Sequence, residues 1–279
     1  MTIDEFHCME HRLGWKHEYW DKAAQLSVQE TAVAHFERAV SQPLPTSPPL
    51  PANYQLRAIQ PDDADGLTEL FERAFDDTDD FTGWPADAFR RHARDSVSSF
   101  FGETTRRHVG SAGRLSASFV IESESQLVAA AFVRNDREGP MLSPLMVDPA
   151  HQRRGLATSL LRSSLQALQA DGLPTLFSAC YLCNAASLKW HPQNGFVERD
   201  NSFAARHRAH HYEWLSLHHT ARQQPEIAQQ MHDLSEHWFG VTEKVEEEEF
   251  AEFRARVKDP VAQSAGDQGS DEIGRPTPD

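Results

Sequence analysis

The run Gln152-Arg153-Arg154-Gly155-Leu156-Ala157 has the residue types and spacing of an anion-binding loop. It follows an apolar segment, Leu145-Met146-Val147, that ends just before a proline, as a strand does where a hydrogen-bond donor is lost. It precedes leucines that recur every three or four residues from Leu156 to Leu168, the period of one helix face. Free N–H groups at a helix N-terminus bind phosphate, and Gly155 and Ala157 let an anion approach the backbone closely. The run therefore predicts a phosphate site between a strand and a helix.

A second segment, from Asn184 to Gly195-Phe196, follows another short strand. Gln152-x-x-Gly155-x-Ala157 and this Asn-helix-Gly-Phe segment together resemble two motifs of the GCN5-related N-acetyltransferase (GNAT) superfamily, in the same order and on the same elements. The resemblance covers about residues 54–217. It implies an α/β acyl-CoA N-acyltransferase fold with a mixed, mostly antiparallel central sheet flanked by helices, here with N- and C-terminal extensions.

The resemblance also implies that acetyl-CoA is the cosubstrate and assigns its contacts. The backbone of the strand before the loop would bond the pantetheine arm and supply an oxyanion donor, and the loop N–H groups would hold the pyrophosphate. Asn184 would reach the pantetheine or diphosphate region. The cofactor-binding residues expected on these grounds are Leu145, Met146, Val147, Gln152, Arg153, Arg154, Gly155, Leu156, Ala157 and Asn184.

His191 is the expected catalytic residue. The family usually has a tyrosine at this position, between the asparagine and the glycine of the second segment, and the tyrosine protonates the leaving thiolate. Imidazole can replace it, because its unperturbed pKa of about 6.5 allows it to act as an acid or a base near neutrality. The alternative is that His191 only packs against pantetheine and that water transfers the proton.

The sequence shows no obvious general base. The strand ahead of the loop lacks the carboxylate that the family often has there, which leaves Ser143, Glu122 or a relayed water as candidates. A histidine of the predicted closing strand, Phe203 to Leu217, could line the acceptor pocket, with His207 and His211 on one face. No carboxylate or cysteine spacing accompanies these histidines, so we expect no metal site.

The acidic composition limits the partners. The net charge of -15 argues against nucleic acid and favours a cationic small molecule as the amine acceptor. The stretch Asp76 to Asp80, between two predicted helices, would attract a protonated amine or is simply a solvated loop. The sequence shows neither a signal peptide nor an apolar run long enough to span a bilayer, so we expect a soluble, cytoplasmic protein without membrane contact. Homodimerisation is left open.

The three cysteines do not suggest a disulfide framework. Cys180 and Cys183 have the spacing of a redox motif, but they lie where a strand ends rather than where a helix starts. We interpret them as reduced cysteines near the cofactor groove.

Changes in composition divide the chain. Residues 1–50 are predicted to be an N-terminal extension, and the stretch 42–51 at its end includes five prolines. Residues 51–219 are the predicted acetyltransferase domain, 220–258 a helical C-terminal extension, and 259–279 a disordered tail rich in Pro, Gly, Ser and Asp.

The predicted function is acyl-CoA-dependent acetyl transfer to a primary amine by direct attack in a ternary complex. The missing tyrosine and the missing strand carboxylate support an alternative, a catalytically inactive CoA-binding sensor or regulatory module. A third alternative is an interaction protein built on residues 1–50 and 220–258.

Overall fold

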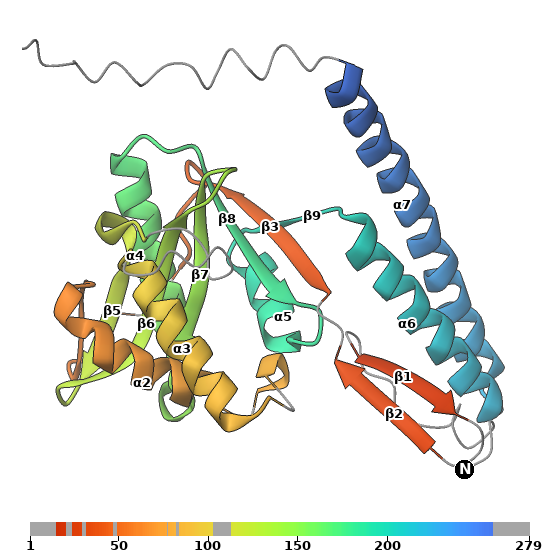
Figure 1. The fold of residues 1–279 in the computed structure, drawn as a ribbon, viewed down its shortest axis with the longest axis horizontal. Helices are drawn as coiled ribbons and strands as arrows, with labels where there is room; N and C mark the ends of the chain where they lie inside the picture. Colours follow the sequence, from red (N-terminus) through yellow and green to blue (C-terminus); the bar gives the residue numbers. More distant parts are fainter. Residues whose placement is uncertain are drawn as a thin grey trace, which may run out of the picture.

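The computed structural model describes residues 15–20, 24–29, 32–46, 49–76, 78–81, 84–102 and 113–258. The predicted disordered tail, 259–279, and Cys8 lie outside the described residues. Figure 1 shows a sheet with helices on both faces and a long helical hairpin at one side. The described chain is therefore an α/β protein, as predicted.

A seven-stranded mixed sheet forms the centre of the fold. All of its pairings are antiparallel except the parallel pair of β7 and β8. Two further strands, β1 (Trp15–Trp20) and β2 (Ala24–Gln29), form a separate antiparallel pair. In spatial order the strands of the large sheet are β4 (Tyr54–Ala58), β5 (Phe119–Ser123), β6 (Gln126–Asn135), β7 (Pro140–Val147), β8 (Thr175–Tyr181), β3 (Val33–Ala39) and β9 (Val197–Arg199).

Six α-helices accompany the sheet in the described part of the chain. None of them is both long and apolar enough to cross a membrane. Short 3-10 turns η2 (Asp79–Phe81) and η4 (Pro149–His151) lie in two of the connections that matter below. The α-helices are α2 (Ala64–Phe75), α3 (Ala86–Phe100), α4 (Leu156–Ala170), α5 (Ala185–Gln193), α6 (Ser202–Ala221) and α7 (Pro225–Lys258).

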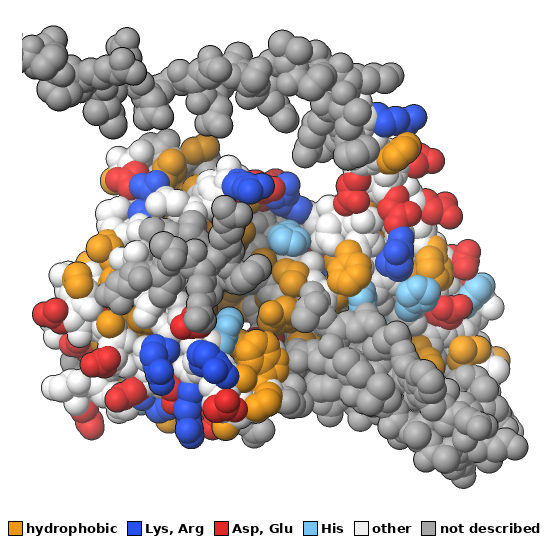
Figure 2. Space-filling model, in the orientation of Figure 1, with side chains coloured by type: hydrophobic (Ala, Val, Ile, Leu, Met, Phe, Trp, Pro, Cys, Tyr) orange, Lys and Arg blue, Asp and Glu red, His pale blue; other side chains and the backbone are white. Residues whose placement is uncertain are grey.

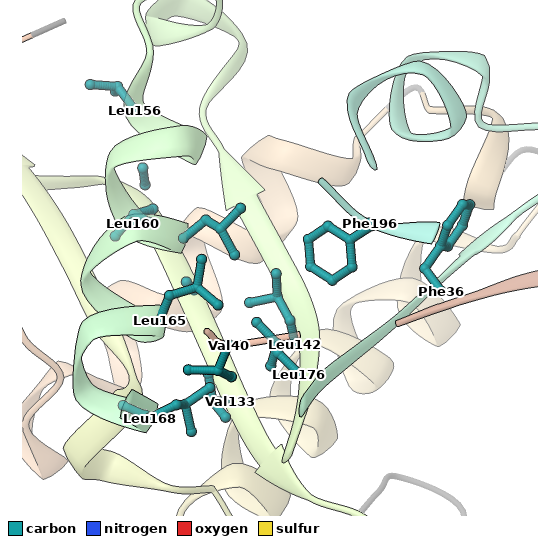
Figure 3. Close-up of a cluster of buried hydrophobic side chains, with 14 of the residues drawn as sticks. Phe36, Val40, Val133, Leu142, Leu156, Leu160, Leu165, Leu168, Leu176 and Phe196 are labelled. Atoms are coloured by element: carbon teal, nitrogen blue, oxygen red, sulfur yellow. The ribbon is translucent and has the colours of Figure 1, made fainter. Parts of the chain in front are cut away.

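Two hydrophobic clusters fix which helices lie on which face. The buried leucines of α4 pack on Val133, Leu142 and Leu176 of the sheet, together with Phe36 and Phe196 (Figure 3). The apolar sides of α2 and α3 pack on the opposite face, against alternate residues of β5, β6 and β7. Because side chains alternate across a strand, β5, β6 and β7 each contribute to both clusters. The strand, loop and helix predicted around Gly155 are confirmed.

The segment predicted as a closing strand, Phe203 to Leu217, is instead helix α6, so that prediction was wrong. The family's element order suggested a closing strand here, but the small residues Ala204, Ala205 and Ala209 are buried on one helix face. Asn201 caps the helix by accepting a hydrogen bond from the Ala204 N–H at 2.7 Å. The helix then pairs with α7 in the hairpin of Figure 1.

The position beside β8 is filled by β3, which comes from the segment that we assigned to the N-terminal extension. The period of that segment did not distinguish strand from helix. In the structure β3 pairs along the full length of β8 on one side and with β9 on the other. The central sheet therefore includes residues on both sides of the proline-rich stretch.

Candidate functional site

Strands β7 and β8 separate in the middle of the sheet. They pair only at Met141↔Phe177 and Leu142↔Ser178, although β7 continues to Val147 beside β6. Beyond Leu142, the β7 edge that faces β8 has no ladder partner among the described residues. Three of the predicted cofactor contacts, Leu145 to Val147, lie on this free edge, where backbone groups can bond an extended ligand.

A buried arginine holds β7 at the point of separation. The register of β6 and β7 shifts there, and Arg134 of β6 donates from Nε to the Ser143 carbonyl at 2.8 Å. Its Nη2 also donates to the Ser96 carbonyl of α3 at 2.8 Å. The guanidinium lies 5.6 Å from the ring centroid of Phe100 and 5.7 Å from that of Phe132. Burial lowers the pKa of Arg134 to about 10, so the side chain stays cationic at neutral pH.

The loop after β7 presents free backbone donors. Gly155 has φ +79° and Arg153 has φ +58°, so the backbone turns through the left-handed region twice before α4 begins. The first hydrogen bond of the helix runs from the Ser159 N–H to the Gly155 carbonyl at 2.9 Å. Within the described residues, the N–H groups of 153–158 donate to no backbone or side-chain acceptor. They form the anion-binding helix start that the sequence predicted.

The two arginines of the loop differ in how they are held. Arg154 donates from Nη1 to the Tyr54 hydroxyl at 2.8 Å and from Nη2 to the Ala150 carbonyl at 3.2 Å. The Tyr54 oxygen also bonds Nδ1 of His151 at 2.9 Å, which ties β4 to the loop. Arg153 is exposed, so its side chain is accessible to a bound anion. Leu156 is buried in the α4 core, so only its N–H can serve the site.

The end of β7 is fixed by an ion pair from α2. Arg73 donates from Nε to the Asp148 carboxylate at 2.8 Å and from Nη2 to the Leu127 carbonyl at 2.9 Å. Asp148 also accepts a bond from the Ala150 N–H at 3.0 Å. Burial opposes ionisation of Asp148, but the bonds from Arg73 and Ala150 outweigh it and lower the pKa of the carboxyl. Gln152 donates to the Val147 carbonyl at 3.3 Å and closes the turn.

Asn184 is engaged within the protein. Its Oδ1 caps α5 by accepting from the Ser187 N–H at 2.9 Å, and its Nδ2 donates to Asp80 at 2.9 Å. Asp80 belongs to the acidic stretch between α2 and α3 and is buried, whereas Asp76 is exposed. One member of the predicted amine-attracting stretch thus joins η2 to the start of α5, at the end of β8 where the strands have separated.

His191 is buried, with a relative exposure of 3%. Its Nδ1 lies 2.7 Å from the Ser187 carbonyl and its Nε2 lies 2.9 Å from the Ser178 hydroxyl. The ring stacks on Phe36 of β3 with a centroid distance of 4.2 Å. Burial lowers the pKa of His191, and the backbone bond only partly offsets this. Both ring nitrogens therefore bond protein groups, and Ser178, which also lies 3.2 Å from the Leu142 carbonyl, stands at the last pair of β7 and β8.

The other proton-transfer candidates are dispersed. Glu122 is paired with Arg57 on the β4–β5 side of the sheet. Ser143 lies in the irregular part of β7 described above. The histidines expected on a strand lie on α6, where burial lowers the pKa of His211 to about 4. In the described part of the chain, no three His, Cys, Asp or Glu side chains are grouped to hold a metal ion.

The two cysteines of the CxxC spacing lie at the end of β8 and just beyond it. Burial raises the pKa of Cys180 to about 12, with a smaller opposing effect from the Ser187 hydrogen bond. Cys183 is buried, and its sulfur lies 4.0 Å from Asp80. A thiol with a raised pKa is a poor nucleophile at neutral pH.

A cleft of about 340 Å³ opens where α2, η2 and α3 meet. Aromatic side chains form much of its wall, and Trp84 is 45% exposed there. Glu72 and Asp76 add negative charge, and Arg73 and Arg90 add positive charge. The aromatic lining residues are Phe75, Phe81, Trp84 and Phe89.

Sequence reasoning missed Arg38, which supports the second motif. This buried arginine of β3 donates from Nε to the Asn194 carbonyl at 2.8 Å and from Nη2 to the Pro43 carbonyl at 2.6 Å. A Cβ on Gly195, whose φ is +80°, would lie 3.1 Å from Arg38 Nε. Arg38 is part of a strand whose place in the sheet depends on distant pairing, so no local pattern identifies its role.

The described geometry agrees with comparisons to known proteins. Residues 67–196 match the model of the acetyltransferase (GNAT) family. The search of curated proteins gave no match.

Among solved structures, the chain is similar to a GCN5-related N-acetyltransferase from Sphaerobacter thermophilus, at 15% identity, covering 60% of this chain and 48% of that one, with a TM-score of 0.44. It thus spans about half the length of that protein. A PaiA N-acetyltransferase from Thermoplasma acidophilum in complex with coenzyme A gives 12% identity, 53% and 92% coverage and a TM-score of 0.43. A GNAT family acetyltransferase from Brucella melitensis in complex with acetyl-CoA is 20% identical. The match covers 43% of this chain and 71% of that one, with a TM-score of 0.32.

Proposed function

We propose that this chain, whose residues 67–196 match the model of the acetyltransferase (GNAT) family, moves an acetyl group from acetyl-CoA to a primary amine by direct attack in a ternary complex. The observation that carries the proposal is the separation of β7 from β8 beyond Leu142 and Ser178, directly before the free N–H groups of 153–158. A free strand edge followed by an anion-binding helix start suits a ligand with an extended amide arm and a pyrophosphate.

Each part of the cofactor has matching groups in this chain. The N–H groups at the start of α4 would bond the pyrophosphate, with Arg153 and Arg154 adding positive charge. The backbone of 145–147 would bond the pantetheine arm and donate to the carbonyl oxygen as it becomes negative during attack. The amine would approach the separated strands from the face of the sheet opposite α4.

We propose that His191 acts through Ser178 rather than on sulfur itself. Its Nε2 bonds the Ser178 hydroxyl at the vertex of the gap, and its Nδ1 is held by Ser187. A neutral imidazole that donates from Nδ1 accepts from the hydroxyl at Nε2 and fixes its orientation. His191 would thus be a positioning residue whose loss changes kcat more than acetyl-CoA binding.

A CoA-binding module without catalysis is the second candidate. It is favoured by the burial of His191 and by the engagement of Asn184 with Asp80 and α5, because neither side chain is free to meet a ligand. In that case the long α6–α7 hairpin would be a partner-binding appendage.

Turnover separates the two candidates. The full chain is incubated with acetyl-CoA and a panel of primary amines, and free CoA thiol is detected over the rate without enzyme. Acetylated amine in the product mixture supports the transferase. Saturable acetyl-CoA binding with no product from any amine would contradict it and support the binding module.

A further inference from the structure

One face of β3 and β9 is open to solvent, and the β8 residues beside it, Phe177 and Ala179, are half-buried. His35 and Glu37 of β3 are exposed although β3 is an interior strand of the sheet, and Val197 of β9 is 60% exposed. The opposite face of the same strands is covered, because Phe36 stacks on α5 and Glu198 pairs with Arg208 of α6. Antiparallel strands commonly pack one face and leave the other in solvent, and β3 is antiparallel to both of its neighbours, so its outer face is accessible to a ligand.

This open face continues the side of the sheet on which α2 and α3 pack. Phe177 of β8 is paired with Met141 of β7, and Met141 points away from Leu142 of the α4 core. Figure 2 shows hydrophobic and histidine side chains at the surface between α3 and the α6–α7 hairpin. The open face and the start of α4, which binds the cofactor in the proposed function, therefore lie on opposite sides of the sheet.

The open face borders the β7–β8 gap. His35 stands directly opposite Ala179, the first β8 residue after Ser178, where the pairing with β7 ends. Neighbouring strands are about 4.8 Å apart, so His35 lies one strand spacing from the edge of the gap. An amine resting beside it can place its nitrogen in the gap, within reach of a carbonyl carbon held on the other side.

The chemistry of the face fits a cation with an apolar body. Two carboxylates, Glu37 and Glu138, share one guanidinium, Arg199, which also lies 5.5 Å from the Phe177 ring centroid. Glu37, Glu138 and Arg199 together carry a net charge of one negative unit. Phe177 and Val197 provide apolar surface.

Resting on the proposed function, we infer that the acceptor amine docks on this face of β8, β3 and β9. Glu37 and His35 attract its ammonium group towards the gap, where the nitrogen gives its proton to water before it attacks. The acceptor class is a primary amine on an aromatic or aliphatic body. Strand β3, from the N-terminal part of the chain, is then a determinant of acceptor specificity.

The test places a positive or a negative charge at one exposed position, Val197, and measures the KM for the amine with the full chain. Val197→Lys and Val197→Glu are similar in size and both should fold, because Val197 is largely exposed. The probes are phenethylamine, spermidine and a lysine-containing peptide. We expect Val197→Lys to raise, and Val197→Glu to lower, the KM for phenethylamine, with the Kd of acetyl-CoA unchanged.

Glu37→Gln provides the second variant and Glu124→Gln its matched control, because Glu124 is exposed in the turn between β5 and β6. We expect Glu37→Gln to raise the amine KM about tenfold, the loss of one charge-assisted contact, and Glu124→Gln to leave it unchanged. We also expect phenethylamine to have the lowest KM among the three probes.

The outcomes are distinct. If the unmodified chain acetylates an amine but the two Val197 variants move its KM together or not at all, this inference is overturned and the proposed function stands. A chain that binds acetyl-CoA and acetylates none of the probes overturns both. If spermidine has the lowest KM of the three probes, while the Val197 variants change the KM as expected, the assigned acceptor class is overturned.

Discussion

The contact between Gly195 and Arg38 gives the sharpest stability prediction. Gly195 has φ +80°, and a Cβ there would lie 3.0 Å from Gln42 Oε1 and 3.1 Å from Arg38 Nε, which donates to the Asn194 carbonyl. An alanine in the left-handed region costs about 1–2 kcal/mol. Displacing Arg38 adds at most about 3 kcal/mol, the contribution of a hydrogen bond from a charged group. Gly195→Ala should therefore lower the free energy of unfolding by more than the backbone term alone and by at most about 5 kcal/mol.

Gly172→Ala is the matched control. Gly172 also has a positive φ, +72°, but nothing lies within 4 Å of the position of a Cβ. This variant should cost only the backbone term of about 1–2 kcal/mol. The difference between the two variants therefore measures the contacts of the added Cβ with Gln42 and Arg38.

Urea unfolding of the two variants, followed by tryptophan fluorescence, measures that difference. In a chain that also carries Arg38→Met, Gly195→Ala should lower the unfolding free energy by less, because the guanidinium that the added Cβ would crowd is absent. Equal costs for the two glycine variants, to within about 0.5 kcal/mol, would refute the claim that β3 supports the second motif through Arg38.

Three further predictions follow from the site. Replacing His191 by Asn should lower kcat about a hundredfold with little change in the Kd of acetyl-CoA, and equal losses in both would contradict a positioning role. Arg73→Met should destabilise the chain more at neutral pH than in acid: the pKa of Asp148 is lowered in the folded state, so the stability from this pair is present above the unfolded pKa of about 3.9 and is lost as pH falls through the folded pKa. In acid only the loss of the bond to the Leu127 carbonyl should remain, and a destabilisation of the same size at both pH values would contradict this linkage. Cys180 should resist iodoacetamide at pH 8, because its pKa is raised to about 12, and rapid alkylation seen by mass spectrometry would contradict that burial.

Local patterns predicted the cofactor side of the fold well. The leucine period, the glycine and the proline stop identified β7, the loop and α4 because each of these signals is short-range. The same holds for α2, whose buried residues Leu67, Leu70, Phe71 and Ala74 recur at helical spacing.

The acceptor side could not be predicted in the same way. The place of β3 in the sheet is decided by pairing with β8, far along the chain, and its alternating sequence only says that one face is buried. For α6, the family's element order suggested a strand, but packing against α7 and the Asn201 cap favour the helix. His191 and Asn184 were identified by motif position, whereas their hydrogen bonds to Ser178 and Asp80 depend on tertiary structure.

Binding of acetyl-CoA at the start of α4 is the central claim, and thermal unfolding with and without the ligand tests it most directly. Ala157→Glu places a carboxylate among the free N–H groups, where it suits the helix dipole but repels a pyrophosphate. Gln169→Glu adds the same charge at an exposed position near the other end of α4. At about a hundred times its Kd, acetyl-CoA should stabilise the unmodified chain and Gln169→Glu by about 2.7 kcal/mol and leave Ala157→Glu unshifted. No shift in the unmodified chain, or an equal shift in all three proteins, would contradict the site.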